Sequence, residues 1–222
     1  MATVGFIGSG MIGSTVARLA VAAGHAVVLS NSRGPDTLKE LTGELGLMAR
    51  AATAEEAADT GDLVVVAIPL LAYHSVPVRP LVGKAVVDAN NYYPRRDGHI
   101  ADLDSGQLTS SGLLQSHLRE SSVVKAFNNI YYRHLASLAR PAGAGDRSYL
   151  PIAGDNTQAK AAVTTFLDTT GYGAVDAGPL AESWRQQPGE PVYGTPYGPY
   201  EDPRGRPASE GTIRAALAAA TR

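Results

Sequence analysis

The sequence predicts an α/β protein built on a Rossmann-type, doubly wound, mainly parallel sheet with a smaller C-terminal extension. The first observation is a G-x-G-x-x-G motif, Gly8 to Gly13, that lies between a β-prone segment and an apolar helical stripe. The second is a repeated alternation of short apolar runs with helical patterns. Several of these runs are apolar throughout, which is typical of strands covered on both faces.

The first elements form a βαβ unit. Residues 3–7 favour a strand, Gly24 ends the helix that follows the glycine motif, and residues 26–30 favour a second strand. The helical stripe consists of Ile12, Val16, Leu19, Ala20 and Ala23.

The alternation continues to the end of the chain. Helices are predicted at residues 36–45, 54–60, 113–119, 131–138, 157–169 and 209–220. Strands are predicted near Leu47 and at residues 62–68, 84–90, 122–127, 148–153 and 173–177. Residues 91–107 are expected to be irregular, and the segment 188–207, rich in proline, glycine and tyrosine, is expected to be an ordered or semi-ordered loop.

Composition narrows the possible partners. The 222 residues carry a net charge of -2, which offers no basic surface to nucleic acid and favours a small-molecule partner. The chain has no cysteine, which excludes disulfides and fits a reducing compartment, so we expect a cytoplasmic protein. No apolar run reaches the roughly 18 to 20 residues of a membrane span. The five histidines lack metal-ligand spacing, so no metal site is predicted.

The glycine motif predicts a nucleotide site. Gly8 permits the tight turn, Gly10 lets the backbone approach a pyrophosphate, and Gly13 allows close contact between helix and strand. The helix N-terminus offers unpaired N–H groups to the anion. The alternative is a glycine turn with only a structural role.

The end of the second predicted strand indicates NADP rather than NAD. NAD enzymes usually place Asp or Glu there, whereas this chain has Asn31, Ser32 and Arg33. Arg33 can neutralise the 2′-phosphate of adenosine, which a carboxylate would repel; the alternative is a solvated loop cation. The carboxyl ends of the later strands should border the nicotinamide, which adds Ile68, Pro69, Asn90 and Ala126 to the candidates.

Four segments of the chain resemble one known family. They are residues 5–33, the motif Asn90-Asn91-Tyr92-Tyr93-Pro94, the motif Lys125-Ala126-Phe127-Asn128-Asn129, and the motif Ser183-Trp184-Arg185-Gln186-Gln187-Pro188-Gly189. Together they resemble the NADPH-dependent coenzyme F420 reductases, the deazaflavin:NADP oxidoreductases. The resemblance spans most of the chain.

The resemblance implies reversible hydride transfer between nicotinamide C4 and deazaflavin C5 in a homodimer. The stretch 141–145, rich in proline and glycine, predicts a domain boundary near residue 145. With this boundary, residues 1–145 are expected to form the Rossmann NADP-binding domain. The resemblance implies that residues 146–222 form a smaller domain that covers the second ligand and could contribute to the dimer interface. It also places the NADP contacts at Ser9, Gly10, Met11, Ile12, Asn31, Ser32 and Arg33.

Hydride transfer requires two rings held in contact and no dedicated nucleophile. Donors that stabilise charge on the reduced deazaflavin are candidates for catalysis, namely Asn128, Asn129 and Arg185. The Asn pair could equally cap a helix, and Arg185 could pair with a carboxylate. His74 could donate a proton near the nicotinamide or be an ordinary helix residue.

Two other functions remain open at this stage. The protein could pass the hydride of NADPH to a different acceptor, such as an imine, a carbonyl or a flavin. It could also be a non-catalytic NADP-binding sensor.

Overall fold

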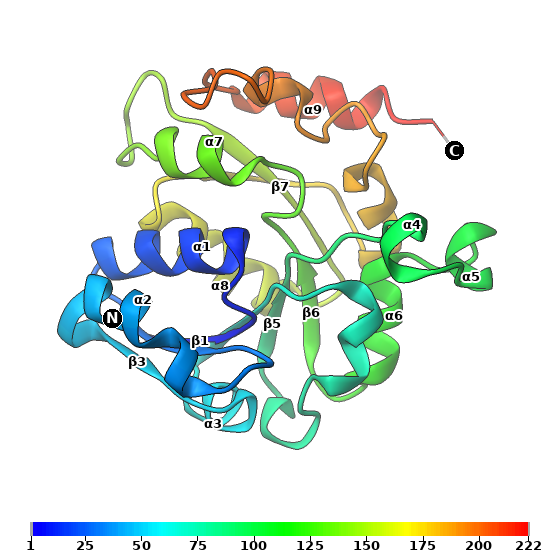
Figure 1. The fold of residues 1–222 in the computed structure, drawn as a ribbon. Coiled ribbons are helices and arrows are strands. Elements are labelled where there is room, and N and C mark those ends of the chain that lie inside the picture. The colour runs from blue at the N-terminus through cyan, green and yellow to red at the C-terminus, as the bar shows by residue number, and fades with distance from the viewer. Residues whose placement is uncertain (1, 222) are drawn as a thin grey trace.

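The central feature of the computed structural model, which describes residues 2–221, is one eight-stranded sheet (Figure 1). Its strand order is β3-β2-β1-β4-β5-β6-β7-β8, and every pairing is parallel except that of β6 with β7. The strands are β1 (Thr3–Ile7), β2 (Ala26–Ser30), β3 (Ala49–Ala51), β4 (Leu63–Val66), β5 (Ala85–Asp88), β6 (Ser122–Lys125), β7 (Tyr149–Gly154) and β8 (Gly173–Asp176). The predicted Rossmann-type, mainly parallel fold is confirmed.

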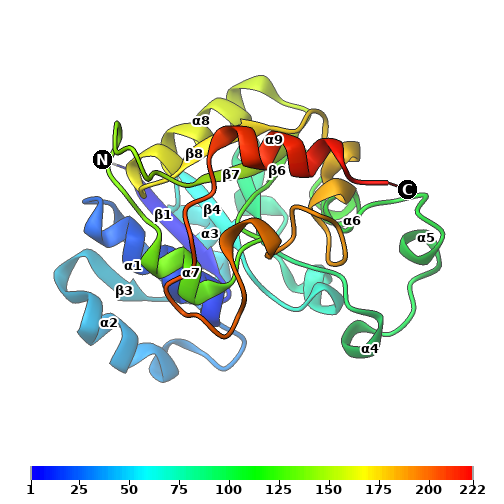
Figure 2. The same ribbon diagram turned by 90° about the horizontal axis from the view of Figure 1, so that it is seen from above.

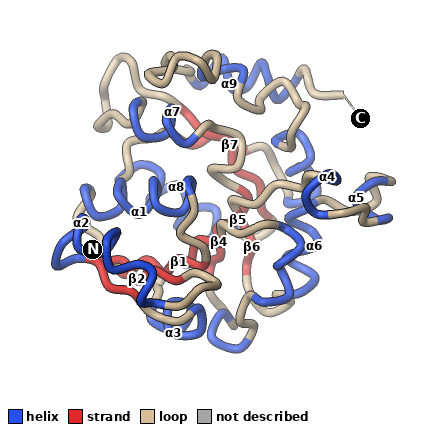
Figure 3. The backbone as a smooth tube through the Cα atoms, in the orientation of Figure 1, coloured by secondary structure: helices blue, strands red, loops and turns tan. Residues whose placement is uncertain are grey.

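Helices cover both faces of this sheet (Figure 2, Figure 3). They are α1 (Met11–Ala22), α2 (Lys39–Leu45), α3 (Ala54–Thr60), α4 (Pro94–Asp97), α5 (Ala101–Asp104), α6 (Ser110–His117), α7 (Tyr132–Ser137), α8 (Thr157–Thr169) and α9 (Glu210–Ala218). Helices α1, α7 and α8 contribute to one hydrophobic core, and α3 and α6 contribute to a second on the opposite face. Both strand faces are therefore buried, as the all-apolar runs predict.

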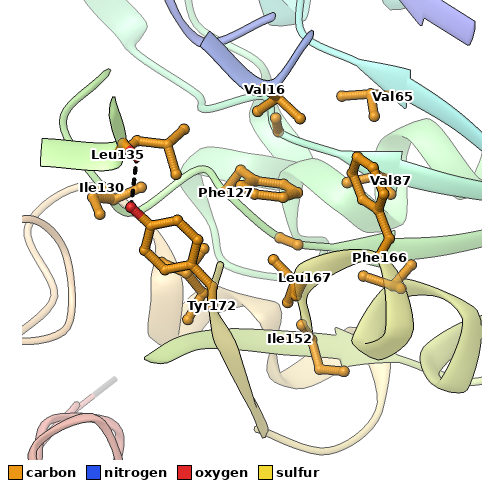
Figure 4. Close-up of a cluster of buried hydrophobic side chains, with 14 of the residues drawn as sticks. Val16, Val65, Val87, Phe127, Ile130, Leu135, Ile152, Phe166, Leu167 and Tyr172 are labelled. Atoms are coloured by element: carbon orange, nitrogen blue, oxygen red, sulfur yellow. Dashed lines mark hydrogen bonds between the residues drawn. The ribbon is translucent and has the colours of Figure 1, made fainter. Parts of the chain in front are cut away.

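The larger core joins the two halves of the chain. Figure 4 shows Phe127, at the end of β6, between Val16 of α1 and Phe166 of α8. The hydroxyl of Tyr172 is buried here and donates to the carbonyl oxygen of Leu135 at 2.6 Å. The predicted boundary near residue 145 lies in the loop between α7 and β7, and the sheet continues beyond it.

Two local predictions differ from the structure. Residues 91–107, expected to be irregular, contain α4 and α5, because Pro94 occupies the first turn of α4 and Gly98 ends it with a φ of 72°. The strand expected near Leu47 begins two residues later, since Gly46–Met48 form a 3₁₀ turn before β3.

Gly5 of β1 sets the distance between the sheet and α3. A Cβ atom built on Gly5 would lie 2.1 Å from the carbonyl oxygen of Ala57 in α3. We expect Gly5→Ala to lower the free energy of unfolding by about 2 kcal/mol, because the helix must move away from the strand. Urea unfolding followed by circular dichroism measures the change.

The matched control is Gly43→Ala in α2. No described residue lies within 4 Å of a Cβ atom built there, so we expect it to raise the free energy of unfolding by up to about 1 kcal/mol through helix propensity. Equal losses in the two variants would contradict the role assigned to Gly5.

Candidate active site

The glycine loop between β1 and α1 is shaped by close backbone contacts. Gly8 has a φ of 101°, and a Cβ atom there would lie 2.2 Å from the carbonyl oxygen of Ala67. A Cβ atom on Gly13 would lie 2.1 Å from the carbonyl oxygen of Gly8. At Gly10, by contrast, none of the described residues lies within 4 Å of a built Cβ atom. The loop is therefore closed toward the protein and open at Gly10, which lines a cavity.

The first turn of α1 faces this opening. Gly10 is its N-cap and provides no side-chain hydrogen bond, and the first turn contains no acidic side chain. The N–H groups at the start of a helix attract anions when no side chain caps them. An open glycine next to an uncapped twelve-residue helix fits the pyrophosphate of a dinucleotide.

The corner after β2 lies beside the glycine loop. The Ser9 hydroxyl donates to the carbonyl oxygen of Ser30 at 2.9 Å, which joins the two segments. The carboxamide oxygen of Asn31 accepts from the backbone N–H of Arg33 at 2.9 Å and fixes the turn. Ser32 and Arg33 are exposed, and the described residues include no carboxylate in ion-pair contact with Arg33. Its charge is thus available to a phosphate.

A cavity of about 670 Å³ opens from the glycine loop across the carboxyl ends of the strands. This size is in the usual range for small-molecule sites. One wall is made of predicted cofactor residues: Gly10, Met11, Ile12, Ile68, Pro69 and Asn90. A second group of lining residues, which we call the second wall, consists of Tyr93, Arg96, Asn128, Asn129, Ile130, Tyr131, Tyr132, Tyr193 and Tyr200, and Ala67, Ala89 and Asn91 complete the lining.

A buried ion pair supports the floor of the cavity. The Lys125 ammonium, at the end of β6, lies 3.1 Å from Asp88 Oδ2 at the end of β5, and both side chains are at most 1% exposed. Asp88 also accepts from the Ser111 hydroxyl at 2.6 Å and from the backbone N–H of Asn90 at 2.9 Å. Burial lowers the pKa of Lys125, against the attraction of Asp88 that raises it.

This network positions Asn90. Lys125 donates to the carbonyl oxygen of Asn90, and the Asn90 carboxamide oxygen accepts from the backbone N–H of Ile68 at 2.8 Å. The amide nitrogen Nδ2 of Asn90 is buried and has no hydrogen-bond partner within residues 2–221. Because Asn90 lines the cavity, this unused donor is suited to a polar group of a bound ligand.

The Asn pair after β6 attaches the C-terminal segment to the site. Asn128 Nδ2 donates to the carbonyl oxygen of Gln186 at 2.7 Å, and Asn129 Nδ2 donates to that of Val192 at 3.0 Å. Phe127, just before the pair, has a φ of 62°, a left-handed conformation that is costly for a bulky residue. The carboxamide oxygens of both Asn residues are buried without a partner among the described residues.

Of the predicted site residues outside the glycine loop and the corner after β2, three do not line the cavity. Arg185 pairs with Glu182 at 2.7 Å and stacks on Trp184, with 4.5 Å from its guanidinium carbon to the ring centroid. His74 lies against Tyr73 in the 3₁₀ turn after Pro69. Ala126 is fully buried in the core. The site roles of these three residues remain predictions, because none of the three borders the cavity.

Tyrosines are the site residues that sequence reasoning missed or left undecided. Five of the chain's ten tyrosines line the cavity, and two of them, Tyr193 and Tyr200, come from the segment 188–207. The available signal is the composition: tyrosines outnumber phenylalanines ten to three, and four of them form the doublets Tyr92-Tyr93 and Tyr131-Tyr132. Sequence periodicity alone does not bring these positions together.

A family profile and one curated protein match the N-terminal part of the chain. The profile, described as NADP oxidoreductase coenzyme F420-dependent, matches residues 3–92. Protein YjhV of Escherichia coli (strain K12) is 42% identical over 53 residues, which is 24% of this chain and 39% of that protein. The chain therefore spans only about two fifths of this curated relative.

Solved structures extend the similarity to most of the chain. The protein SMa0349 from Sinorhizobium meliloti is 31% identical and has a TM-score of 0.74, over 86% of this chain and 93% of that one. A protein from Arthrobacter sp. FB24, provisionally named an F420-dependent NADP reductase, is 22% identical with a TM-score of 0.70, over 83% and 88%. An imine reductase from Pseudomonas sp. is 20% identical with a TM-score of 0.54, over 88% of this chain and 58% of that one.

The described residues lack two features. Within residues 2–221 no helix is both long and apolar enough to cross a bilayer. The same residues contain no cluster of three or more His, Cys, Asp or Glu side chains arranged to bind a metal ion.

Loss of one charge of the Lys125–Asp88 pair should strongly lower the stability of the protein. We expect Lys125→Met to lower the free energy of unfolding by about 3 to 5 kcal/mol, because Asp88 is left as a buried charge without its counterion. Urea unfolding measures the loss. The double variant Lys125→Met/Asp88→Asn removes both charges and should be more stable than the single variant; a double variant that is less stable would contradict this account.

Proposed function

Because this chain belongs to the family of coenzyme F420-dependent NADP oxidoreductases, we propose that it transfers a hydride between NADPH and the deazaflavin F420. The observation that carries the proposal is that one cavity is lined both by the glycine loop with the strand ends, the first wall, and by a group rich in tyrosine, the second wall. One ligand can lie along the first wall and a second planar ligand can lie against the other.

The residues of the first wall fit NADPH. The open backbone at Gly10 and the uncapped start of α1 suit the pyrophosphate, and Arg33 suits the 2′-phosphate. At the far end, Asn90 Nδ2 is a buried donor suited to the nicotinamide carboxamide. NADPH supplies the hydride, and these residues hold its reactive ring toward the centre of the cavity.

The residues of the second wall fit an aromatic, electron-accepting ligand. The rings of Tyr131 and Tyr200 lie edge to face, with 5.2 Å between their centroids, and both border the cavity. Arg96 is the one side chain with a full positive charge among the described lining residues, and its guanidinium carbon lies 4.9 Å from the Tyr93 ring centroid. Arg96 is paired with Asp97 at 2.8 Å, so this wall can stack a deazaflavin and offer tyrosine hydroxyls as donors to negative charge that develops on it.

A different acceptor is the second candidate. The tyrosine hydroxyls on the same wall are also donors suited to a carbonyl or imine.

The two candidates are distinguished by mixing purified protein and NADPH with oxidised F420, a flavin, a cyclic imine or a carbonyl compound. We expect loss of the F420 absorbance together with loss of the NADPH band. Turnover of another acceptor alone would support the second candidate, and tight NADPH binding without any turnover would contradict both.

The proposed contact of Arg33 with the 2′-phosphate predicts a preference for NADPH over NADH. We expect Arg33→Ala to raise the dissociation constant of NADPH by about 10- to 100-fold, because a charge-assisted contact with the 2′-phosphate is lost. The dissociation constant of NADH should change little. Titration calorimetry measures both. Arg119→Ala, which removes an exposed cation beyond the cavity lining, is the control; equal losses for NADPH and NADH in Arg33→Ala would contradict the phosphate contact.

A further inference from the structure

The proposed reaction leaves one proton without an assigned source. NADPH transfers a hydride, that is, one hydrogen and two electrons, whereas the reduced ligand also gains a proton on a nitrogen or oxygen atom. A side chain that supplies this proton must touch the ligand and must be able to lose and regain the proton. The candidates are therefore the side chains that line the cavity.

The lining contains few groups of this kind. Among the described residues, no His, Asp, Glu or Lys side chain borders the cavity. Arg96 is not deprotonated in proteins, which excludes it as a donor of the proton. The nearby carboxylate of Asp97 is buried and accepts hydrogen bonds from Arg96 and from the backbone N–H of Tyr93. The five tyrosine hydroxyls are the remaining candidates.

Two of these hydroxyls differ from the others. The hydroxyls of Tyr93 and Tyr193 are hydrogen-bonded to each other. Because one O–H group donates to the other oxygen, the pair retains one hydrogen for a third partner. The described residues provide no such partner for either hydroxyl, and both side chains line the cavity. The hydroxyls of Tyr131 and Tyr132 are also hydrogen-bonded to each other, but Tyr132 in addition accepts from Arg133 at 3.0 Å, and Tyr200 is half-exposed.

We propose that the Tyr93–Tyr193 hydroxyl pair donates the proton that accompanies hydride transfer, and that the second ligand receives it on a nitrogen or oxygen atom near Tyr93. The tyrosine O–H bond breaks as an N–H or O–H bond forms on the ligand. The hydride that leaves nicotinamide C4 forms a C–H bond on the same ligand. The phenolate that remains regains a proton from its partner tyrosine, and the pair regains one from water. This inference rests on the proposed function.

The surroundings of the pair keep it protonated at rest. Burial is the main cause that raises the pKa of Tyr193, so its hydroxyl carries its proton at neutral pH, and the same burial opposes the loss of that proton. The Arg96 guanidinium, which is paired with Asp97, lies over the Tyr93 ring and acts in the opposite direction, because its charge lowers the pKa of Tyr193. Tyr193 belongs to the C-terminal segment and Tyr93 to the loop after β5, so the donor forms only where these two segments meet.

The test uses Tyr93→Phe and Tyr193→Phe, which keep the rings and remove one hydroxyl each. With NADPH and oxidised F420 as the probe, we expect kcat to fall by about 100-fold or more in both variants. The wild-type protein should show a normal solvent deuterium isotope effect on kcat, which should change in the variants. The dissociation constant of NADPH and the melting temperature should remain close to the wild-type values.

A binding measurement complements the kinetics. In the non-reactive complex with NADP⁺, the dissociation constant of oxidised F420 should rise about three- to tenfold in each variant, because one hydrogen bond to the ligand is lost. Tyr73→Phe is the control. Its ring is part-buried near the strand ends but does not line the cavity, so kcat and both dissociation constants should be unchanged.

The outcomes separate this inference from the proposed function. If the wild-type protein reduces F420 and both variants keep its kcat and isotope effect, the tyrosine pair is not the donor and the proposed function stands. If kcat and NADPH affinity fall together, the hydroxyls have a structural role and the inference is wrong. If the wild-type protein binds NADPH but does not reduce F420, the proposed function fails and this inference fails with it.

Discussion

The site depends on a charge pair that is buried where two parallel strands end. Lys125 and Asp88 occupy paired positions on β6 and β5, and their hydrogen bonds reach Asn90, Ser110 and Ser111. Removing two charges from water is costly, and the cost is offset only when each polar atom has a well-placed partner. Here these partners fix the loop after β5 against α6, and the loop carries the floor of the cavity. A pair of apolar residues would fill the same space but would leave the backbone N–H and carbonyl groups of Asn90 without these hydrogen-bond partners.

The second wall depends on a different kind of constraint. The left-handed backbone at Phe127 turns the chain so that Asn128 and Asn129 can hold the C-terminal segment through their amide groups. Such a conformation costs about 1 to 3 kcal/mol and persists where the surrounding contacts determine it. The packing of the Phe127 side chain in the hydrophobic core holds its backbone in this conformation. Strain at the end of β6 and the placement of the tyrosine wall are thus parts of one arrangement.

The glycine-loop part of the first wall can be located in the sequence because its signals are local. The glycine motif, the strand before it and the helix after it lie within about twenty residues, and close packing at Gly8 and Gly13 permits little variation. The second wall could not be predicted from pattern because its contacts are long-range: Tyr93 and Tyr193 are separated by 100 residues. Arg185 is a different case, because the carboxylate that pairs with its guanidinium, Glu182, lies only three residues before it.

The reversed direction of β7 has a consequence for how this protein can diversify. Because β7 runs antiparallel to β6 and pairs with it only at Ala153 and Gly154, the chain leaves β8 at Asp176, level with the carboxyl end of β6. Gln186 then accepts from Asn128 of the cavity lining. The segment that follows is residues 188–207, which lack regular strands and supply Tyr193 and Tyr200. Substitutions or insertions along it alter the acceptor side while the dinucleotide half keeps its geometry. Selection for a new acceptor can therefore act on a surface loop without disturbing the inherited cofactor fold.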